Sequence, residues 1–194
     1  MRRTAALLTG TALLALAVTA CGPTGGNTVS TQPKQTAAAS AGGSPSSKAP
    51  SSKAPSVAKV GDTIGLKGMN QGASADITVV KVVDNAQSAT DGINPADGKR
   101  WVAVQFRIKN TGTAAYSDAP SNGATVLDDQ GQSYNSVVAD TTAGQSFPTP
   151  LNIAAGDSAL GFITFEVPTG TKLSKAQFTL DSGFADQTGQ WQLG

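Results

Sequence analysis

The side chains that could carry out chemistry in this sequence are hydroxyls, lysines and carboxylates, because its 194 residues contain no histidine. Without imidazole, a Ser-His-Asp triad and a histidine-ligated zinc or copper site are excluded. The remaining hydrolytic candidates are the pair Ser174 and Lys175 and the pair Asp157 and Glu166. Adjacent residues of a strand point to opposite faces, and Glu166 lies two residues before Pro168, which favours a solvated strand end. We therefore expect no enzyme and no catalytic residue.

Asp128 and Asp129, with Gln130 and Gln132 close by, could supply oxygen ligands to a calcium ion. This segment lacks the alternating aspartates and the distal glutamate of a calcium-binding loop. Aspartate in a hairpin also commonly accepts hydrogen bonds from its own turn. We therefore expect these side chains to stabilise a turn, and we expect no metal ion and no cofactor.

Cys21 is the single cysteine, so no disulfide can form within the chain. It follows an apolar run over residues 5–20, which is shorter than the roughly 20 residues that a membrane-spanning helix needs. The small residues Thr19 and Ala20 would fit the pocket of a signal peptidase, and residues 16–22 resemble the lipobox of bacterial prolipoproteins. This resemblance implies cleavage before Cys21 and a diacylglycerol group attached to its sulfur by a thioether.

Residues 22–58 consist mainly of Ser, Ala, Thr, Gly, Pro, Gln and Lys, and their only large aliphatic residues are Val29 and Val57. Such a composition cannot bury enough apolar area to offset the loss of chain entropy. The immediate repeat of Ser-Ser-Lys-Ala-Pro also indicates a linker. We therefore divide the chain into a signal peptide (1–20), a lipidated cysteine with a disordered linker (21–58) and a folded domain (59–194).

The folded domain shows short apolar runs separated by Gly, Asn, Asp and Pro, at spacings typical of β-sandwiches and barrels. Residues 100–109 give the clearest strand, because apolar positions from Val102 to Ile108 alternate with more polar ones. Residues 159–167 are apolar at both odd and even positions, so both faces of this strand are apolar. This pattern predicts a strand that is covered on both faces or that supports an exposed patch. Eight or nine strands are expected, at residues 63–66, 76–83, 100–109, 124–127, 133–138, 151–153, 159–167, 176–180 and 190–193.

Four aromatic residues would serve a sugar or protein partner if they were exposed: Trp101, Tyr116, Tyr134 and Trp191. Trp101 lies on the strand face opposite the main apolar residues, where packing in a second layer is favoured over an exposed platform. Trp191 is expected to close the last strand onto the sandwich. Residues 84–97 are rich in aspartate and predict a long loop at the end of the sandwich, where such folds commonly bind ligands.

Four segments together carry a resemblance to a known family: Val60–Thr63, the run 98–112 ending in Asn-Thr-Gly, Leu127–Tyr134, and 153–168. In this order they resemble the bacterial domain of unknown function 4352, over about residues 59–193. Members resemble secreted immunoglobulin-like sandwiches, including small mycobacterial immunogenic secreted proteins, and commonly follow a lipoprotein signal and a low-complexity tail. The resemblance implies an immunoglobulin-like antiparallel β-sandwich and supplies no catalytic residues.

We expect a lipoprotein on the extracellular face of the cell membrane that acts as a non-catalytic binding or envelope-associated module. Its partners would be the membrane, through the lipid anchor, and an unidentified protein or envelope component, with the chain itself a monomer. The 14 basic residues nearly balance the 13 acidic ones, which argues against nucleic acid as a partner. Two alternatives stay open: a small-molecule or metal-ion sensor or carrier in the same location, and a cell-wall hydrolase that uses a Ser-Lys or carboxylate pair.

Overall fold

The computed structural model describes residues 27–34 and 57–194, so the expected signal peptide, Cys21 and most of the expected linker lie outside the described residues. Within these ranges the chain forms eleven β-strands, one short helix and one 3-10 turn. The strands are β1 (Thr28–Ser30), β2 (Thr63–Lys67), β3 (Ser74–Val83), β4 (Lys99–Asn110), β5 (Tyr116–Asp118), β6 (Ala124–Asp128), β7 (Ser133–Val137), β8 (Leu151–Ile153), β9 (Ser158–Pro168), β10 (Leu173–Thr179) and β11 (Gln187–Gln192), and the helical segments are α1 (Pro120–Gly123) and η1 (Asp181–Gly183). All nine strands expected from the sequence are therefore present.

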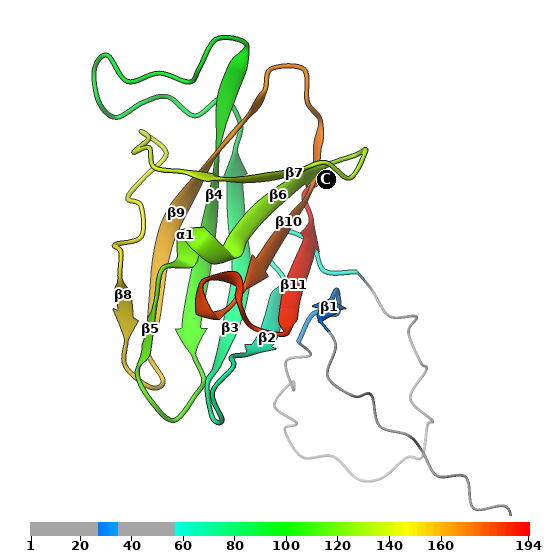
Figure 1. Ribbon diagram of the computed structural model, residues 1–194, viewed down its shortest axis with the longest axis vertical. Helices are drawn as coiled ribbons and strands as arrows, with labels where there is room; N and C mark the ends of the chain where they lie inside the picture. The colour runs from blue at the N-terminus through cyan, green and yellow to red at the C-terminus, as the bar shows by residue number, and fades with distance from the viewer. Residues whose placement is uncertain (1–26, 35–56) are drawn as a thin grey trace, which may run out of the picture.

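Nine of these strands pair edge to edge in the order β1-β11-β10-β6-β7-β9-β4-β3-β2, and β5 pairs with β8 separately. β7 joins two layers, because its first residues pair with β6 and Ser136 and Val137 pair with β9. The layers face each other (Figure 1), and the ring centroids of Phe106 on β4 and Phe178 on β10 lie 5.3 Å apart between them. The expected all-β, immunoglobulin-like antiparallel sandwich is confirmed.

The alternation in β4 places one face of this strand in the main core. Val102, Val104, Phe106 and Ile108 are each at most 1% exposed, and they meet buried side chains of the opposite layer such as Phe178. Burial of an apolar side chain of this size contributes roughly 1.5–3 kcal/mol. A local pattern of period two therefore determines which face of the central strand is buried.

The outer face of β4 and β9 carries a second, smaller apolar cluster formed by Ala86, Trp101, Ala103 and Phe162. The segments that follow β3 and β7 cover this face, because Ala86 belongs to the cluster and Ala139 and Ala143 pack against it. β9 is therefore a strand covered on both faces over much of its length. The cluster also buries Trp101 to 3% exposure, so the expectation of a second packing layer is confirmed.

Residues 27–34 require a correction to the expected disordered linker. Thr28–Ser30 form β1, which pairs in parallel with Gln187–Gly189 of β11. Lys34 then donates its backbone N–H to the carbonyl of Thr63 at 2.6 Å, and its ammonium group lies 2.6 Å from Asp76. Composition did not predict this strand, because its order comes from the free edge of β11 rather than from apolar residues of its own.

The folded domain also begins before residue 59. Ala58 is fully buried, and its backbone N–H donates to the carbonyl of Thr31 at 2.7 Å. The segment around β1 and the start of the main domain therefore stabilise each other across the intervening residues. None of the described helices is long and apolar enough to cross a membrane.

Candidate functional site

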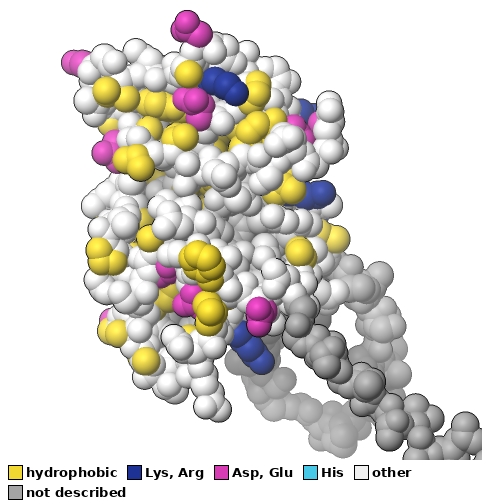
Figure 2. Space-filling view, viewed as in Figure 1, with side chains coloured by type: hydrophobic (Ala, Val, Ile, Leu, Met, Phe, Trp, Pro, Cys, Tyr) yellow, Lys and Arg dark blue, Asp and Glu magenta, His cyan; other side chains and the backbone are white. Residues whose placement is uncertain are grey.

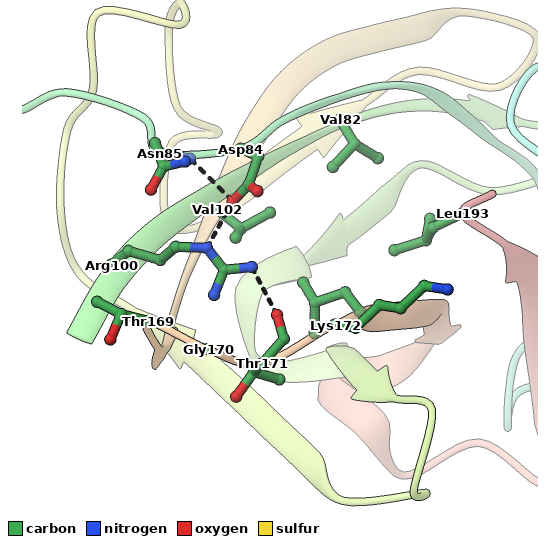
Figure 3. A pocket seen from close by; sticks show the side chains of 11 residues that line it. Val82, Asp84, Asn85, Arg100, Val102, Thr169, Gly170, Thr171, Lys172 and Leu193 are labelled. Carbon is green, nitrogen blue, oxygen red and sulfur yellow. Dashed lines mark hydrogen bonds and ion pairs between the residues drawn. The ribbon is translucent and has the colours of Figure 1, made fainter. Parts of the chain in front are cut away.

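A groove of about 440 Å³ opens between the two layers at the end of the sandwich where β3 ends and β4 begins (Figure 3). Residues distant in the sequence meet here: the end of β3, the start of β4, the turn between β9 and β10, and the C-terminal end of the chain. Its lining residues are Val82, Asp84, Asn85, Arg100, Val102, Thr169, Gly170, Thr171, Lys172, Leu173 and Leu193. We call this feature the Arg100 groove.

Arg100 organises the groove through three donors of its guanidinium group. Nε donates to Oδ1 of Asp84 at 2.7 Å, Nη1 to the carbonyl of Pro168 at 2.8 Å, and Nη2 to the carbonyl of Thr171 at 2.9 Å. The Arg100 side chain is only 12% exposed, and Figure 3 shows it lying across the groove between the two segments that it joins. A planar guanidinium with several fixed acceptors holds these segments in one arrangement. The groove is therefore preformed.

The groove combines an apolar part with a polar rim. Val82, Val102 and Leu193 contribute apolar surface, whereas Thr169 and the exposed Lys172 contribute hydrogen-bond donors. Small-molecule and peptide sites commonly have this composition, in which apolar area gives affinity and a few polar groups give orientation. The arrangement can bind a ligand that has an apolar body and an acceptor or anionic group near Lys172.

The structure does not bring the candidate Ser-Lys pair together. The Ser174 hydroxyl donates to the backbone carbonyl of Asp128 at 2.7 Å, so it stabilises the pairing of β10 with β6. A β-bulge between Leu173 and Lys175 interrupts the alternation here, and among the described residues no hydrogen bond joins the Lys175 ammonium group to this hydroxyl. The ammonium group is therefore not placed to take a proton from this hydroxyl.

Asp157 and Glu166 are also separated. Nine residues of nearly continuous strand place them about 30 Å apart, whereas glycosidase carboxylates lie about 5–10 Å apart. The expectation that Glu166 is a solvated strand end is wrong: its Oε2 accepts hydrogen bonds from Trp101 Nε1 at 3.2 Å and from the backbone N–H of Ala96 at 3.1 Å. Glu166 therefore anchors the 84–97 loop to the outer face of the sandwich.

Asp128 accepts hydrogen bonds from its own hairpin, as the sequence predicts. Its carboxylate accepts from the backbone N–H groups of Gln130 at 3.0 Å and Gln132 at 2.8 Å, and from the hydroxyl of Tyr134 at 3.0 Å. Desolvation by itself would raise the pKa of Asp128, but these hydrogen bonds stabilise the ionised form and lower the pKa below its usual value. Among the residues that the structure describes, no group of three or more His, Cys, Asp or Glu side chains could hold a metal ion.

The four aromatic residues considered as contact platforms all take part in packing or internal hydrogen bonds. Trp191 is fully buried and donates to the carbonyl of Asp62 at 2.9 Å. The hydroxyl of Tyr116 donates to Oδ2 of Asp118 at 3.0 Å, and burial followed by the charge of Asp118 raises the pKa of Tyr116. The large exposed aromatic side chain is instead Phe184, at 76% exposure, which no periodic pattern had indicated.

Comparison with known families identifies one match. The model of the family described as "Domain of unknown function (DUF4352)" matches residues 68–188. No curated protein sequence matches the chain. The match extends from the turn after β2 into β11, so it covers most of the sandwich and all the strands that line the Arg100 groove.

Three solved structures share the fold at low sequence identity. The first is ycdA of Bacillus subtilis, a candidate lipoprotein, with 16% identity and a TM-score of 0.51 over 70% of this chain and 38% of that chain. The second is the secreted protein MPT63 of Mycobacterium tuberculosis, with 15% identity and a TM-score of 0.50 over 69% of this chain and 94% of that chain. The third is yjhA of Bacillus subtilis, with 14% identity and a TM-score of 0.51 over 71% of this chain and 100% of that chain. The matched region spans little more than a third of the length of ycdA. At these identities the likeness concerns the fold alone.

Proposed function

This chain belongs to the DUF4352 family, and we propose that it is a lipoprotein anchored through Cys21 at the extracellular face of the cell membrane. In this proposal the sandwich is a non-catalytic module that binds a protein or another component of the cell envelope at the Arg100 groove. The membrane is its second partner, through the lipid on Cys21. The chain acts as a monomer and uses no cofactor.

The observation that carries this proposal is the preformed groove. Arg100 fixes its shape through bonds to Asp84, Pro168 and Thr171, so a ligand would bind without ordering these segments first. Ser174 and Glu166, one residue of each pair considered for catalysis, form hydrogen bonds that hold a strand and a loop in place. A rigid site with apolar area and a few polar groups supports recognition.

The position of β1 supports the outward presentation of the groove. β1 pairs with the beginning of β11, at Gln187–Gly189, and the groove lies beyond the end of β11, at Leu193. Figure 1 shows β1 and the C-terminus, which Leu193 immediately precedes, at different levels of the sandwich. A chain tethered through the residues before β1 would therefore turn the groove away from the membrane.

The direct test is site-specific photocrosslinking in cells. A photoreactive amino acid at Thr169, on the rim of the groove, is expected to give a discrete adduct, and the substitution Arg100→Ala is expected to remove it. The matched control is Asn152, which is exposed on β8 and is not part of the groove. Identical adducts from both positions, or none from Thr169, would contradict binding at the groove.

The anchor is tested separately. Because Cys21 is the single cysteine, Cys21→Ser removes the lipidation site without affecting a disulfide. This variant is expected to move from the membrane fraction to the medium. Retention on membranes after a high-salt wash would contradict anchoring at Cys21.

The volume of the groove favours one second candidate, a carrier or sensor of a small molecule. Sites for drug-sized ligands typically have volumes of about 300–1,000 Å³, and the groove has about 440 Å³. A bound ligand stabilises the folded state by mass action, so a panel of sugars, organic anions and short peptides can be screened by thermal shift. The substitution Leu173→Trp, which would fill the groove, is expected to abolish any shift that depends on this site.

A further inference from the structure

Three exposed apolar side chains lie around the start of β11: Val29 at 56% exposure, Met69 at 66% and Phe184 at 76%. We call them the tether-end patch. Single exposed apolar residues are normal on a protein surface, but these three come from distant segments and lie at the end of the sandwich where the chain enters β1. Hydrophobic side chains gather over the region of η1 in the lower half of the face shown in Figure 2.

Hydrogen bonds hold the patch together. Asp181 accepts from the backbone N–H of Met69 through Oδ2 at 2.6 Å and from the backbone N–H of Phe184 through its carbonyl at 3.0 Å. This single residue therefore joins the turn after β2 to η1. Thr28 of β1 donates its N–H to the carbonyl of Asp186 at 2.7 Å, two residues after Phe184. The three apolar side chains consequently sit on a common, preorganised support.

The distance to the proposed anchor identifies what this patch can reach. Thr28 follows Cys21 by seven residues, and seven residues span at most about 25 Å even when fully extended. With β1 paired to β11, a lipid on Cys21 therefore keeps this end of the sandwich within about 25 Å of the bilayer surface.

We propose that the tether-end patch contacts the lipid bilayer and orients the domain on the membrane, an inference that rests on the proposed lipidation of Cys21. Aromatic and aliphatic side chains partition into the membrane interface. A weak contact suffices, because the tether gives the patch a high effective concentration at the surface.

The charges beside the patch indicate which lipids are needed. Lys67 and Asp186 are both exposed there and carry opposite charge, while the ammonium group of Lys34 is already paired with Asp76. Attraction to anionic headgroups would require an excess of basic residues. The contact therefore depends on apolar insertion and forms on vesicles of phosphatidylcholine alone.

The test uses the lipidated full-length chain in phosphatidylcholine vesicles, with an environment-sensitive fluorophore on one introduced cysteine. Lipidated Cys21 cannot react, so the label goes to Asn70→Cys, beside Met69, or to Thr169→Cys, on the rim of the groove. Brominated phosphatidylcholine is expected to quench the fluorophore at residue 70 several-fold more strongly than at residue 169. The pair of substitutions Met69→Ser and Phe184→Ser is expected to reduce quenching at residue 70 to the level seen at residue 169.

The matched control variant is Ile93→Ser, because Ile93 is 51% exposed but lies in the 84–97 loop, which Glu166 anchors at the other end of the sandwich. It is expected to leave the quenching unchanged. Equal quenching at residues 70 and 169, or no effect of the patch substitutions, would each overturn the proposal.

Failure of the anchor gives a different result from failure of the patch. If Cys21 reacts with the fluorophore and the chain does not stay on the vesicles, the proposed lipidation is wrong and this inference falls with it. If the chain stays on the vesicles but residue 70 remains unquenched, the anchor stands and the patch does not contact lipid.

Discussion

At the scale of the residue, Arg100, Asp128 and Glu166 use their charges mainly to hold backbone segments in place. Arg100 donates to two carbonyl groups, and Asp128 and Glu166 each accept from backbone N–H groups. For the largely buried Arg100, each hydrogen bond from the charged group is typically worth about 1.5–3 kcal/mol. In a sandwich without disulfides, such bonds fix turns and loops that the core itself does not reach.

The lowered pKa of Asp128 predicts a specific dependence of stability on pH. Because the carboxyl group ionises more readily in the folded chain, its contribution is present above its ordinary pKa of about 4 and is lost as the pH falls through the lower folded value. Asp128→Asn is therefore expected to lower the free energy of unfolding at pH 7 and to reduce its dependence on pH below about 4. Urea unfolding at about six pH values between pH 2 and pH 7 measures both effects.

Asp129 provides the matched control for this experiment, because it is its exposed neighbour in the same turn. Asp129→Asn is expected to retain the pH dependence of the original chain. Equal pH profiles for Asp128→Asn and the unsubstituted chain would show that the hydrogen bonds to this carboxylate do not stabilise the fold.

The buried ring of Phe106 predicts a large loss of stability on truncation. Phe106 is fully buried and packs against Phe178 across the two layers. Phe106→Ala is expected to reduce the free energy of unfolding by about 3–5 kcal/mol, through lost burial and the cavity that remains. Phe184→Ala is the matched control: its ring is exposed, so denaturant unfolding should change by no more than about 0.5 kcal/mol.

At the scale of the element, β1 protects the edge of one layer. A strand of three residues has little intrinsic stability, and β1 is ordered because β11 offers it unpaired backbone groups. An uncovered edge strand can in turn pair with a second molecule. β1 therefore both extends the sheet and blocks association at β11.

Removal of β1 should expose this edge. We expect residues 57–194 to fold without the preceding chain, because the main cores lie within this range. Compared with residues 27–194, however, the shorter fragment is expected to melt at a lower temperature and to form dimers at high concentration. Thermal unfolding and sedimentation measure these properties, and identical behaviour of both fragments would mean that β1 contributes nothing.

At the scale of the whole molecule, β1 divides the expected tether into two parts with different effects. With β1 docked, only the residues between Cys21 and Thr28 set the distance to the membrane, at most about 25 Å. An undocked tether of 37 residues would extend to about 120–130 Å. Residues 35–56 connect two points on the same domain and do not add to the reach.

This division predicts that two equal insertions have unequal effects. A flexible insertion of about 20 Gly and Ser residues directly after Cys21 should increase the reach and reduce the quenching of a fluorophore at residue 70 by brominated lipid. The same insertion within residues 35–56, or scrambling of that segment, should leave the quenching unchanged. A similar loss from both insertions would indicate that β1 does not stay paired with β11 on the membrane.

Local patterns of residue types were sufficient to predict several properties of this chain. Alternation predicted the central strand and its buried face, and apolar runs between turn residues predicted all nine main strands. The absence of histidine excluded whole classes of chemistry, and the single cysteine identified the candidate anchor. The strand predictions held where the structure describes the chain, because strand formation depends strongly on neighbouring residues.

Other features require distant residues to meet, so they became visible only in the folded chain. β1 is ordered by an edge roughly 160 residues away in the sequence. The Arg100 groove needs β3, β4, the β9–β10 turn and the C-terminal end of the chain together, and the tether-end patch needs Val29, Met69 and Phe184 at one end. Pairing order and exposure depend on long-range packing, which residue types and periodicity do not encode locally.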